Sequence, residues 1–240
     1  VNESFGEVVQ WDLVPDFAIN NMQIFTGGDP IFGQNALGGA ITMEMKNGFN
    51  FEGANLTASG GSYFRTNEVL EYGQQFDNVA VYLGANFNYD EGWRDESNAY
   101  LNTVFGDVRY RPNDDTEVFI NFGQAYTDLR GNGAAPLSLL DLEGREAVYT
   151  YPDATHNKNY YANLGGNHFV NDELSIQGNI YYRHMERRNY NGDEFEGGDC
   201  GAQFDYTPGN ANNLLCGELE VGGDSEEFIL DASGATINYA

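Results

Sequence analysis

The sequence predicts an all-β fold, a membrane β-barrel built from antiparallel strands. Three observations carry this prediction. Long segments alternate between apolar and polar residues with a period of two. The connections between these segments alternate between tight turns and longer loops. No apolar run approaches the 18 or so residues of a membrane-spanning helix, whereas barrel strands need only about 9 to 11 alternating residues.

The composition agrees with sheets that separate two environments. Sixteen Tyr and 16 Phe occur beside 30 Gly, a mixture suited to sheet surfaces that are apolar on one side and wet on the other. The chain of 240 residues carries 37 acidic residues against 11 Lys and Arg, which gives a net charge of -26. Such a field repels phosphate backbones, so we expect no nucleic-acid partner.

The first predicted unit is residues 1–48. An apolar patch from Trp11 to Ile19, interrupted by Pro15, predicts a short turn or helix packed on a small sheet. Two short β-type runs, residues 22–25 and 40–45, flank a glycine cluster. Glycine allows positive φ and close approach to other surfaces, so the cluster predicts a tightly folded insert that packs on a barrel wall. Its glycines are Gly27, Gly28, Gly33, Gly38 and Gly39.

The strands follow from residue 49 onward. Residues 79–89 are the clearest case, because one face of the predicted strand is wholly apolar. Residues 117–127 repeat the pattern, with Phe119 as the exception on the polar face. About eight strands are predicted in all. They span residues 51–60, 67–76, 79–89, 100–110, 117–127, 159–169 and 174–183, with another beginning at 235–240.

The connections decide the architecture. In order they span residues 61–66, 77–78, 90–99, 112–116, 129–158, 171–173 and 190–234. A meander with tight turns at one end and long loops at the other is typical of an outer-membrane barrel, whereas a soluble sandwich does not need this segregation. A small barrel is filled by its own side chains and leaves no room for residues 1–48. We therefore expect a larger barrel. We interpret this chain as an internal piece of a longer protein, and this piece contains the first strands of that barrel.

The N-terminal motifs add a family resemblance. A strand leads into a glycine turn, followed by the step Phe32-Gly33, the element Ala36-Leu37-Gly38-Gly39 and a strand that ends near Lys46. Residues 1–46 thereby resemble the final part of the plug domain of TonB-dependent outer-membrane receptors. In one departure, Thr26 stands where many family members carry an Arg that helps to tie the plug to the barrel wall.

The resemblance implies a fold and a function. It implies residues 1–48 as the end of a small α+β plug domain, and residues 49–240 as the N-terminal part of a barrel of about 22 strands that the plug closes. It further implies active uptake of a scarce ligand, commonly a ferric siderophore or similar metal chelate. TonB supplies the energy through a segment upstream of the chain, and no enzymatic step, cofactor or metal site is implied. The rival is a passive porin or surface adhesin, which shares the barrel in the same outer membrane.

Aromatic and basic residues near the strand-to-loop junctions are the candidate ligand-binding residues. Siderophore-type ligands are anionic or aromatic, and Arg together with Tyr or Trp suits both. The candidates are Tyr63, Phe64, Arg65, Trp93, Arg94, Arg130, Tyr149 and Tyr151. The alternative is that Trp and Tyr form the aromatic girdle at the membrane interface. If the apolar face meets lipid, the polar face points Asp107, Arg109, Arg183 and Arg187 into the lumen, where they could contact the plug.

Residues 190–234 hold eleven acids and no Lys or Arg. Such a block predicts a solvated loop, which could bind Ca²⁺ or bridge to lipopolysaccharide through divalent ions, although it lacks EF-hand spacing. Both cysteines, Cys200 and Cys216, lie in it. They predict a disulfide worth about 3 kcal/mol, with two free thiols as the alternative.

No catalytic or metal motif emerges elsewhere. His156, His168 and His184 fall in separate segments, and none has a second ligand at metal spacing. No nucleophile, base and orienting acid occur with a local signature. Residues 28–35 space two glycines as a phosphate loop does, but Gln34-Asn35 occupies the place of the required Lys-Ser/Thr.

Overall fold

The structure is a computed structural model that describes residues 10–27, 38–190 and 192, together with three short strands nearer the C-terminus. The chain divides into two compact units, residues 1–192 and 193–240. In the second unit the described residues form a three-stranded sheet of β10 (Gly198–Asp199), β11 (Leu215–Gly217) and β12 (Glu227–Phe228). Cys200 lies outside the described residues and only the backbone of Cys216 is described, so the disulfide stays a prediction.

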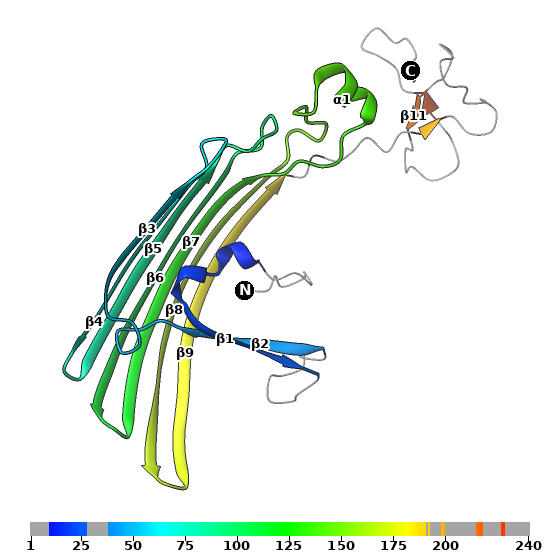
Figure 1. Cartoon of the computed structure of the whole chain (residues 1–240). Helices are drawn as coiled ribbons and strands as arrows, with labels where there is room; N and C mark the ends of the chain where they lie inside the picture. Colours follow the sequence, from blue (N-terminus) through cyan, green and yellow to red (C-terminus); the bar gives the residue numbers. More distant parts are fainter. Residues whose placement is uncertain are drawn as a thin grey trace. The chain divides into compact units, whose positions relative to one another are not determined.

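The first unit is dominated by one antiparallel meander of seven strands (Figure 1). Its strands pair strictly in chain order, with β3 and β9 at the edges, so the sheet does not close on itself within the described residues. They are β3 (Gly53–Gly60), β4 (Thr66–Phe76), β5 (Val79–Asp90), β6 (Ala99–Asn113), β7 (Thr116–Arg130), β8 (Ala154–Asn171) and β9 (Leu174–Tyr190). All seven strands predicted in this region are confirmed, several of them longer than expected. The strand expected from residue 235 lies outside the described residues.

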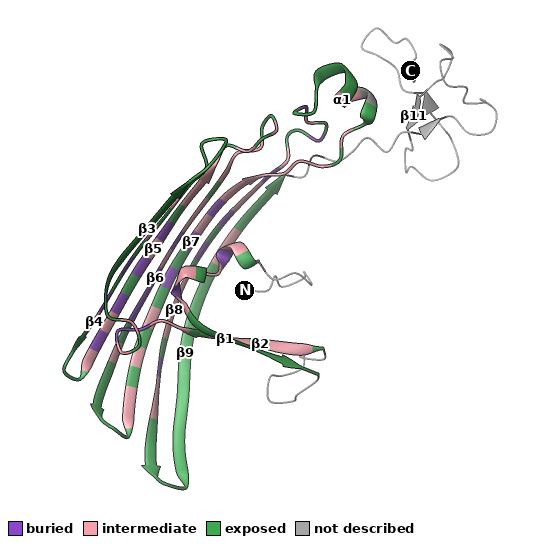
Figure 2. Cartoon of the chain, in the orientation of Figure 1, coloured by how far each residue is buried: buried purple, intermediate pink, exposed green. Residues whose placement is uncertain are grey.

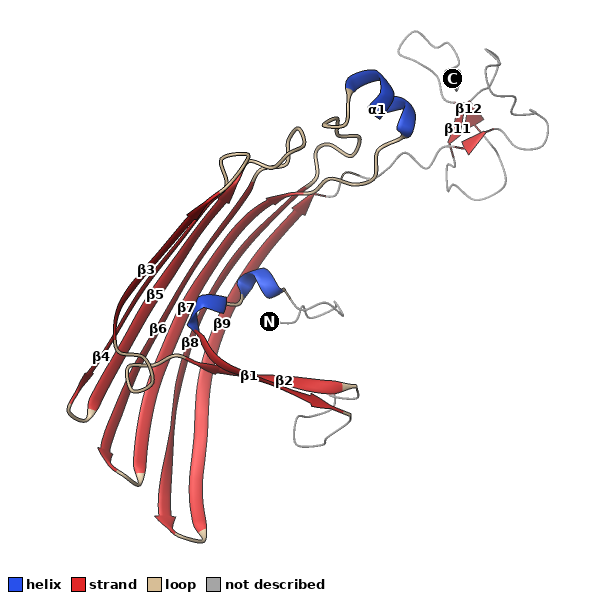
Figure 3. Cartoon of the chain, viewed as in Figure 1, coloured by secondary structure: helices blue, strands red, loops and turns tan. Residues whose placement is uncertain are grey.

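The connections segregate as the sequence predicts. Two-residue turns at 77–78, 114–115 and 172–173 lie at one end of the sheet, and longer loops lie at the other (Figure 3). The last turn is held by Asn171, whose Oδ1 accepts from the backbone N–H groups of Glu173 and Leu174, both at 2.9 Å. The connection predicted at residues 112–116 is shorter than expected, because β6 and β7 pair as far as Asn113 and Thr116.

The loops at the opposite end span residues 61–65, 91–98 and 131–153. The longest of them contains the helix α1 (Leu137–Glu143), which begins after Pro136 and ends at Gly144 with a φ of 97°. Glycine tolerates that backbone conformation, which explains why the helix ends there.

The N-terminal segment, defined as residues 10–27 and 38–48, forms a separate small body against the sheet. Two short 3₁₀ helices, η1 (Trp11–Leu13) and η2 (Asp16–Ala18), lead into a hairpin of β1 (Ile19–Thr26) and β2 (Gly39–Met45). Both the predicted turn or helix and the two predicted β runs are confirmed. At the end of the hairpin the N–H of Gly27 bonds to the carbonyl of Gly38 at 3.3 Å.

The two faces of the sheet have opposite characters, and their burial is the reverse of that in a soluble protein (Figure 2). The inner face, defined as the one that carries Tyr82 and Asp107, holds most of the buried side chains of the sheet, many of them polar. The outer face, which carries Leu83 and Ile120, is apolar and exposed. Strand alternation therefore puts polar groups inside and apolar groups outside, as a barrel in a membrane requires.

The N-terminal segment packs on the inner face. Ala18 meets Tyr82 and Phe105 in a small buried core, with Phe17, Met45, Phe51 and Tyr161 around it. The rings of Phe51 and Tyr82 meet edge to face with centroids 5.4 Å apart. The N–H of Lys46 bonds to the carbonyl of Ala18 at 2.7 Å and closes the segment on itself.

Two features of the inner face explain exceptions in the pattern. Phe119, the apolar residue on the polar side of β7, lies under the guanidinium of Arg109, whose central carbon is 5.1 Å from the ring centroid. Gly84 leaves the space that the Phe17 ring occupies, since a Cβ there would overlap the ring.

We predict that Gly84→Ala loosens the N-terminal segment, because the added methyl group displaces the Phe17 ring. Overpacking of this kind costs about 1–3 kcal/mol. Hydrogen exchange at the amide of Lys46 should become faster by an amount equivalent to that cost. Gly178→Ala is the matched control, since nothing lies within 4 Å of a Cβ at that glycine. Equal exchange rates in the two variants would contradict this account of the packing.

Candidate functional site

A buried ion pair ties the N-terminal segment to the sheet. Lys46, which follows β2, donates from Nζ to Oε1 of Glu71 in β4 at 2.5 Å. The Glu71 side chain is only 4% exposed. It also accepts from Tyr82 Oη at 2.8 Å and from Asn55 Nδ2 at 2.9 Å. We call Lys46, Glu71, Tyr82 and Asn55 the anchor cluster; it joins the segment to three neighbouring strands.

The geometry of the anchor cluster satisfies a charge that would otherwise be costly to bury. A carboxylate without partners in such a site loses several kcal/mol of hydration. Here three donors converge on Glu71, and one of them carries a positive charge. Lys46 also lies over the Phe51 ring, 4.9 Å from its centroid. Lys46, which makes this ion pair, lies at the opposite end of the hairpin from Thr26, the position at which the expected Arg is missing.

A second network runs across the inner face of the sheet itself. Asp107 is fully buried and accepts from Arg109 Nε at 2.9 Å and from Asn121 Nδ2 at 3.2 Å. Asn163 donates to Asn121 at 3.1 Å, and Asn179 donates to Asn163 at 2.9 Å. The network thus crosses from β6 to β9 as a ladder of side-chain hydrogen bonds.

A hollow of about 1150 Å³ lies between the N-terminal segment and the inner face. Arg183, predicted to point into the lumen, lines it together with Asn121 and Asn163 of the ladder. Arg109 lines it too, while its guanidinium is also held by Asp107 and Glu117. Arg187 pairs in register with Asn157, which is buried on the inner face. The four residues expected on the polar face are therefore all on the inner side.

At the loop end of the sheet, Arg94 joins two loops. Its Nη1 donates to the carbonyl of Gly133 at 3.0 Å and its Nη2 to the carbonyl of Ala147 at 2.7 Å. The N–H of Asp95 bonds in the same way to the carbonyl of Glu146 at 2.9 Å. Because both ends of its guanidinium bind backbone, Arg94 acts first as a clamp between residues 91–98 and 131–153.

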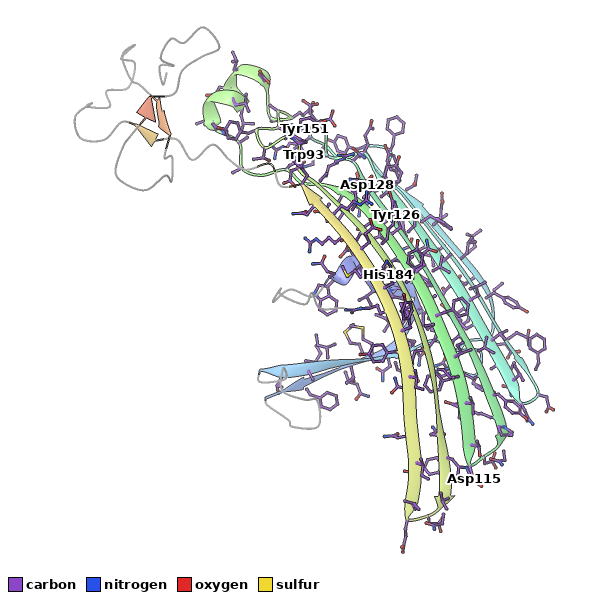
Figure 4. The ribbon with its side chains drawn as sticks, turned by 180° about the vertical axis from the view of Figure 1, so that it is seen from behind. Trp93, Asp115, Tyr126, Asp128, Tyr151 and His184 are labelled. Atoms are coloured by element: carbon purple, nitrogen blue, oxygen red, sulfur yellow. The ribbon has the colours of Figure 1, made fainter. Side chains whose placement is uncertain are left out.

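The same junction gathers the aromatic and cationic groups expected of a ligand site. Trp93 is 48% exposed, and the guanidinium carbons of Arg94 and Arg145 lie 5.8 and 5.7 Å from its ring centroid. We call Trp93, Arg94 and Arg145 the loop-end cluster. It presents an aromatic face flanked by positive charge at the end of the sheet where Figure 4 also shows Tyr151. Such a surface suits an anionic or aromatic ligand.

The other candidate residues are spread along the same end. Tyr63 and Phe64 are exposed in the first loop with φ values of 58° and 51°, and the carbonyl of Tyr63 accepts from the N–H of Glu91 at 3.1 Å. Arg65 lies 3.6 Å from Asp90. Tyr149 and Tyr151 are exposed in the longest loop.

The remaining candidates lie elsewhere. Arg130 belongs to the outer face of β7, 3.9 Å from Asp128, and so faces away from the lumen. Among the glycines of the N-terminal cluster, Gly27, Gly38 and Gly39 close the hairpin, while Gly28 and Gly33 lie outside the described residues. The wall packing predicted for these glycines stays a prediction; close approach to the sheet is seen at Gly48, next to the backbone of Val81.

Sequence reasoning missed the anchor cluster, including Asn55 and the role of Lys46, and it missed Arg145 of the loop-end cluster. Glu71 and Tyr82 looked like ordinary members of alternating strands, and Arg145 lay in a long loop. One signal in the sequence was that Glu71 places an acid between the apolar residues Leu70 and Tyr72.

Two of the three histidines lie against polar side chains of neighbouring strands. His156 Nδ1 lies 3.2 Å from Asp128 Oδ1, and His168 Nδ1 lies 2.9 Å from the hydroxyl of Thr116. Across the described part of the chain, no group of three or more His, Cys, Asp or Glu side chains is arranged to hold a metal ion. The acidic block in which Ca²⁺ binding is expected lies mostly outside that part.

A meander with an apolar exposed face and a polar inner face has the character of a β-barrel wall in a membrane, and a small body tied onto its inner face fits a barrel of the plugged type. Comparison with solved structures agrees. The chain is similar to the ferric-catecholate import receptor Fiu from Escherichia coli K12 in its open form, at 19% identity and a TM-score of 0.63 over 73% of this chain and 30% of that one. For the closed form of the same receptor the identity is 19% and the TM-score is 0.62, over 72% of this chain and 27% of that one.

The siderophore receptor PiuA from Acinetobacter baumannii is also similar, at 15% identity and a TM-score of 0.59, covering 72% of this chain and 27% of that one. The chain therefore spans less than a third of the length of these receptors. At these identities the likeness confirms the fold expected from the resemblance to TonB-dependent receptors.

Two other comparisons found nothing. No protein-family model matches the chain, and no curated protein matches its sequence. Among the helices that the structure describes, none combines the length and apolar character needed to cross a bilayer.

We predict that Lys46→Ala destabilises the full-length protein by roughly 3 kcal/mol, because it leaves Glu71 buried without its cation. Adding Glu71→Gln to this variant should recover part of the loss, since the uncompensated charge disappears. The measurement is chemical unfolding of protein folded into lipid vesicles.

The control for this prediction is Arg65→Ala, which breaks an exposed pair and should cost at most about 1 kcal/mol. If Lys46→Ala cost no more than the control, the anchor cluster would not hold the N-terminal segment to the sheet.

Proposed function

We propose that this chain contributes the end of the plug and the first wall strands of a TonB-dependent outer-membrane receptor that imports a ferric siderophore. The observation that carries the proposal is the buried anchor cluster, through which the N-terminal segment is tied to the polar inner face of the sheet. The likeness of fold to receptors named for ferric-catecholate import and siderophore binding supports it.

A passive porin or an adhesin fits the same sheet less well. A porin lines a water-filled channel with its inner face. Here a folded body packs on part of that face, with Ala18 and Phe105 fully buried at the contact. A body inside the lumen must be moved before solute passes, which calls for a source of energy.

The loop-end cluster supports an anionic, aromatic metal chelate as the ligand. The indole of Trp93 offers a stacking surface, and Arg145 offers a guanidinium that can bond to anionic oxygens. Arg94 is committed to two carbonyl groups, so in this proposal it positions Trp93 and fixes the two loops.

The same proposal assigns the partners and the location. TonB acts on the plug, and the anchor cluster is the contact that resists its pull. The exposed apolar outer face lies in the hydrocarbon of the outer membrane, with lipopolysaccharide around its loop end. The named activity of the similar receptors is import, and the proposal assigns no catalytic step to the chain.

The function is tested by uptake of radioactive iron, supplied as a ferric catecholate, into cells that express the full-length protein as their only receptor. We expect uptake that stops when the proton gradient of the inner membrane is collapsed or TonB is deleted. Passive diffusion through a porin is indifferent to both treatments, so persistent uptake would refute the receptor assignment. No uptake of any iron chelate, with the protein correctly folded, would remove siderophores as the ligand class.

The same cells test the ligand site. Trp93→Ala with Arg145→Gln should weaken ligand affinity by roughly tenfold, as expected for the loss of a stacking surface and a cation. Leu142→Ala is the matched control, because Leu142 is exposed in the same loop but lies outside the cluster. Equal affinities in both variants would place the ligand elsewhere.

A further inference from the structure

The outer face changes character along its length. On β7 the outer side chains run from Val118, Ile120 and Phe122 near the turn end to Tyr126, Asp128 and Arg130 near the loop end. On β9 they run from Ile180 and Tyr182 to His184, Glu186 and Arg188. Figure 4 labels Tyr126, Asp128 and His184 along this part of the sheet. Charged groups therefore replace apolar ones at the same end on both strands.

Tyrosines mark the boundary between the two regions. The last outer aromatic residue before the charged region is Tyr126 on β7, Tyr160 on β8 and Tyr182 on β9. From strand to strand this line descends toward the turn end, since Tyr126 pairs with Lys158 rather than with Tyr160. Barrel strands tilt relative to the barrel axis. Residues at one depth in the membrane are therefore not register partners, and a line of constant depth shifts along the strands from one to the next. Amphipathic rings of this kind lie at headgroup depth.

Register brings the charged groups together beyond that line. Tyr126 faces Lys158, and Lys158 faces Glu186; one row nearer the loops, Asp128 faces His156, and His156 faces Arg188. The side chains surround a hollow of about 230 Å³. It is lined by Tyr126, His156, Lys158, Glu186 and Arg188.

The charges in this hollow leave positive groups available. Arg188 lies 2.6 Å from Glu186 but its side chain is 78% exposed, so its remaining donors are open to solvent. Lys158 is exposed and has no ion pair within the described part of the chain. In a chain with 37 acids and 11 Lys and Arg, these cations on the outer face are a local exception.

We propose that this hollow binds the phosphorylated headgroup of a lipid in the loop-side leaflet, which in an outer membrane is lipopolysaccharide. The inference rests on the proposed location of the protein. Guanidinium and ammonium groups next to the aromatic line lie at the depth of lipid phosphates, and both bind phosphate oxygens strongly. The hollow faces away from the lumen, because Asn157 and Asn159 between its residues point to the inner face. It is therefore out of reach of an imported ligand.

Native mass spectrometry of the full-length protein in detergent tests the site. The probe is lipid A with both phosphates, compared with the same lipid after dephosphorylation. Lys158→Gln with Arg188→Gln should retain the phosphorylated lipid at least about tenfold less well than the natural protein. The dephosphorylated lipid should bind the natural protein as weakly as the phosphorylated lipid binds the variant. Millimolar inorganic phosphate should not displace the lipid.

The matched control is Arg65→Gln with Arg183→Gln, which removes the same charge from a loop and from the inner side of β9. It should retain the lipid as the natural protein does. Equal loss in both double variants, equal retention by all three proteins, or displacement by free phosphate would overturn the proposal. Lipid retention in detergent does not depend on uptake, so a failure here is separate from a failure of the transport assay.

Discussion

Every strand of this sheet has to satisfy two different solvents at once, and the rest of the structure depends on that constraint. In hydrocarbon an unpaired backbone group costs several kcal/mol, so the strands must bond to neighbours along their whole length. The pairing of β3 through β9 in strict chain order meets this requirement within the sheet. The side chains then divide by parity, with apolar groups outward and polar groups inward.

The polar inner face explains how the N-terminal segment is held. An apolar contact alone would be small, because the core cluster within the described residues is built around Ala18, Tyr82 and Phe105. The stronger specificity comes from the anchor cluster, where Lys46 neutralises Glu71 and two further donors complete its hydrogen bonds. Removing one partner from such a pair is costly, but separating both partners into water restores their hydration. A tie of this type is firm while the pair is buried and weakens when water reaches it.

The strands and their order could be predicted from the sequence, because alternation with a period of two is a local property. The same pattern predicted which end of the sheet carries the turns and which carries the loops. It also predicted the two short β runs on either side of the glycine cluster. The anchor cluster could not be predicted. Lys46 and Glu71 are 25 positions apart and meet only because the hairpin of the N-terminal segment returns to the wall near Tyr82.

At the loop end, too, the contacts between distant residues could not be predicted from the sequence. Trp93 and Arg94 were recognisable from residue type and position, but Arg145 lies near Trp93 because the bonds of Arg94 and of the Asp95 N–H hold the two loops together. Phe119 broke the alternation for a reason that lies on the neighbouring strand, where Arg109 covers its ring. Contacts across strands depend on register, and register is not visible in one strand alone.

Spin-label accessibility along β7 tests the central claim most directly. Single cysteines are placed in turn at residues 118 to 123 of the full-length protein in lipid bilayers, with Cys200 and Cys216 replaced by serine. The account predicts that labels at 118, 120 and 122 are relaxed by oxygen dissolved in the lipid, and that labels at 119, 121 and 123 are shielded from it. Alternation with the opposite phase, or labels at all six positions relaxed mainly by a water-soluble nickel chelate, would contradict a lipid-facing apolar side and a covered polar one.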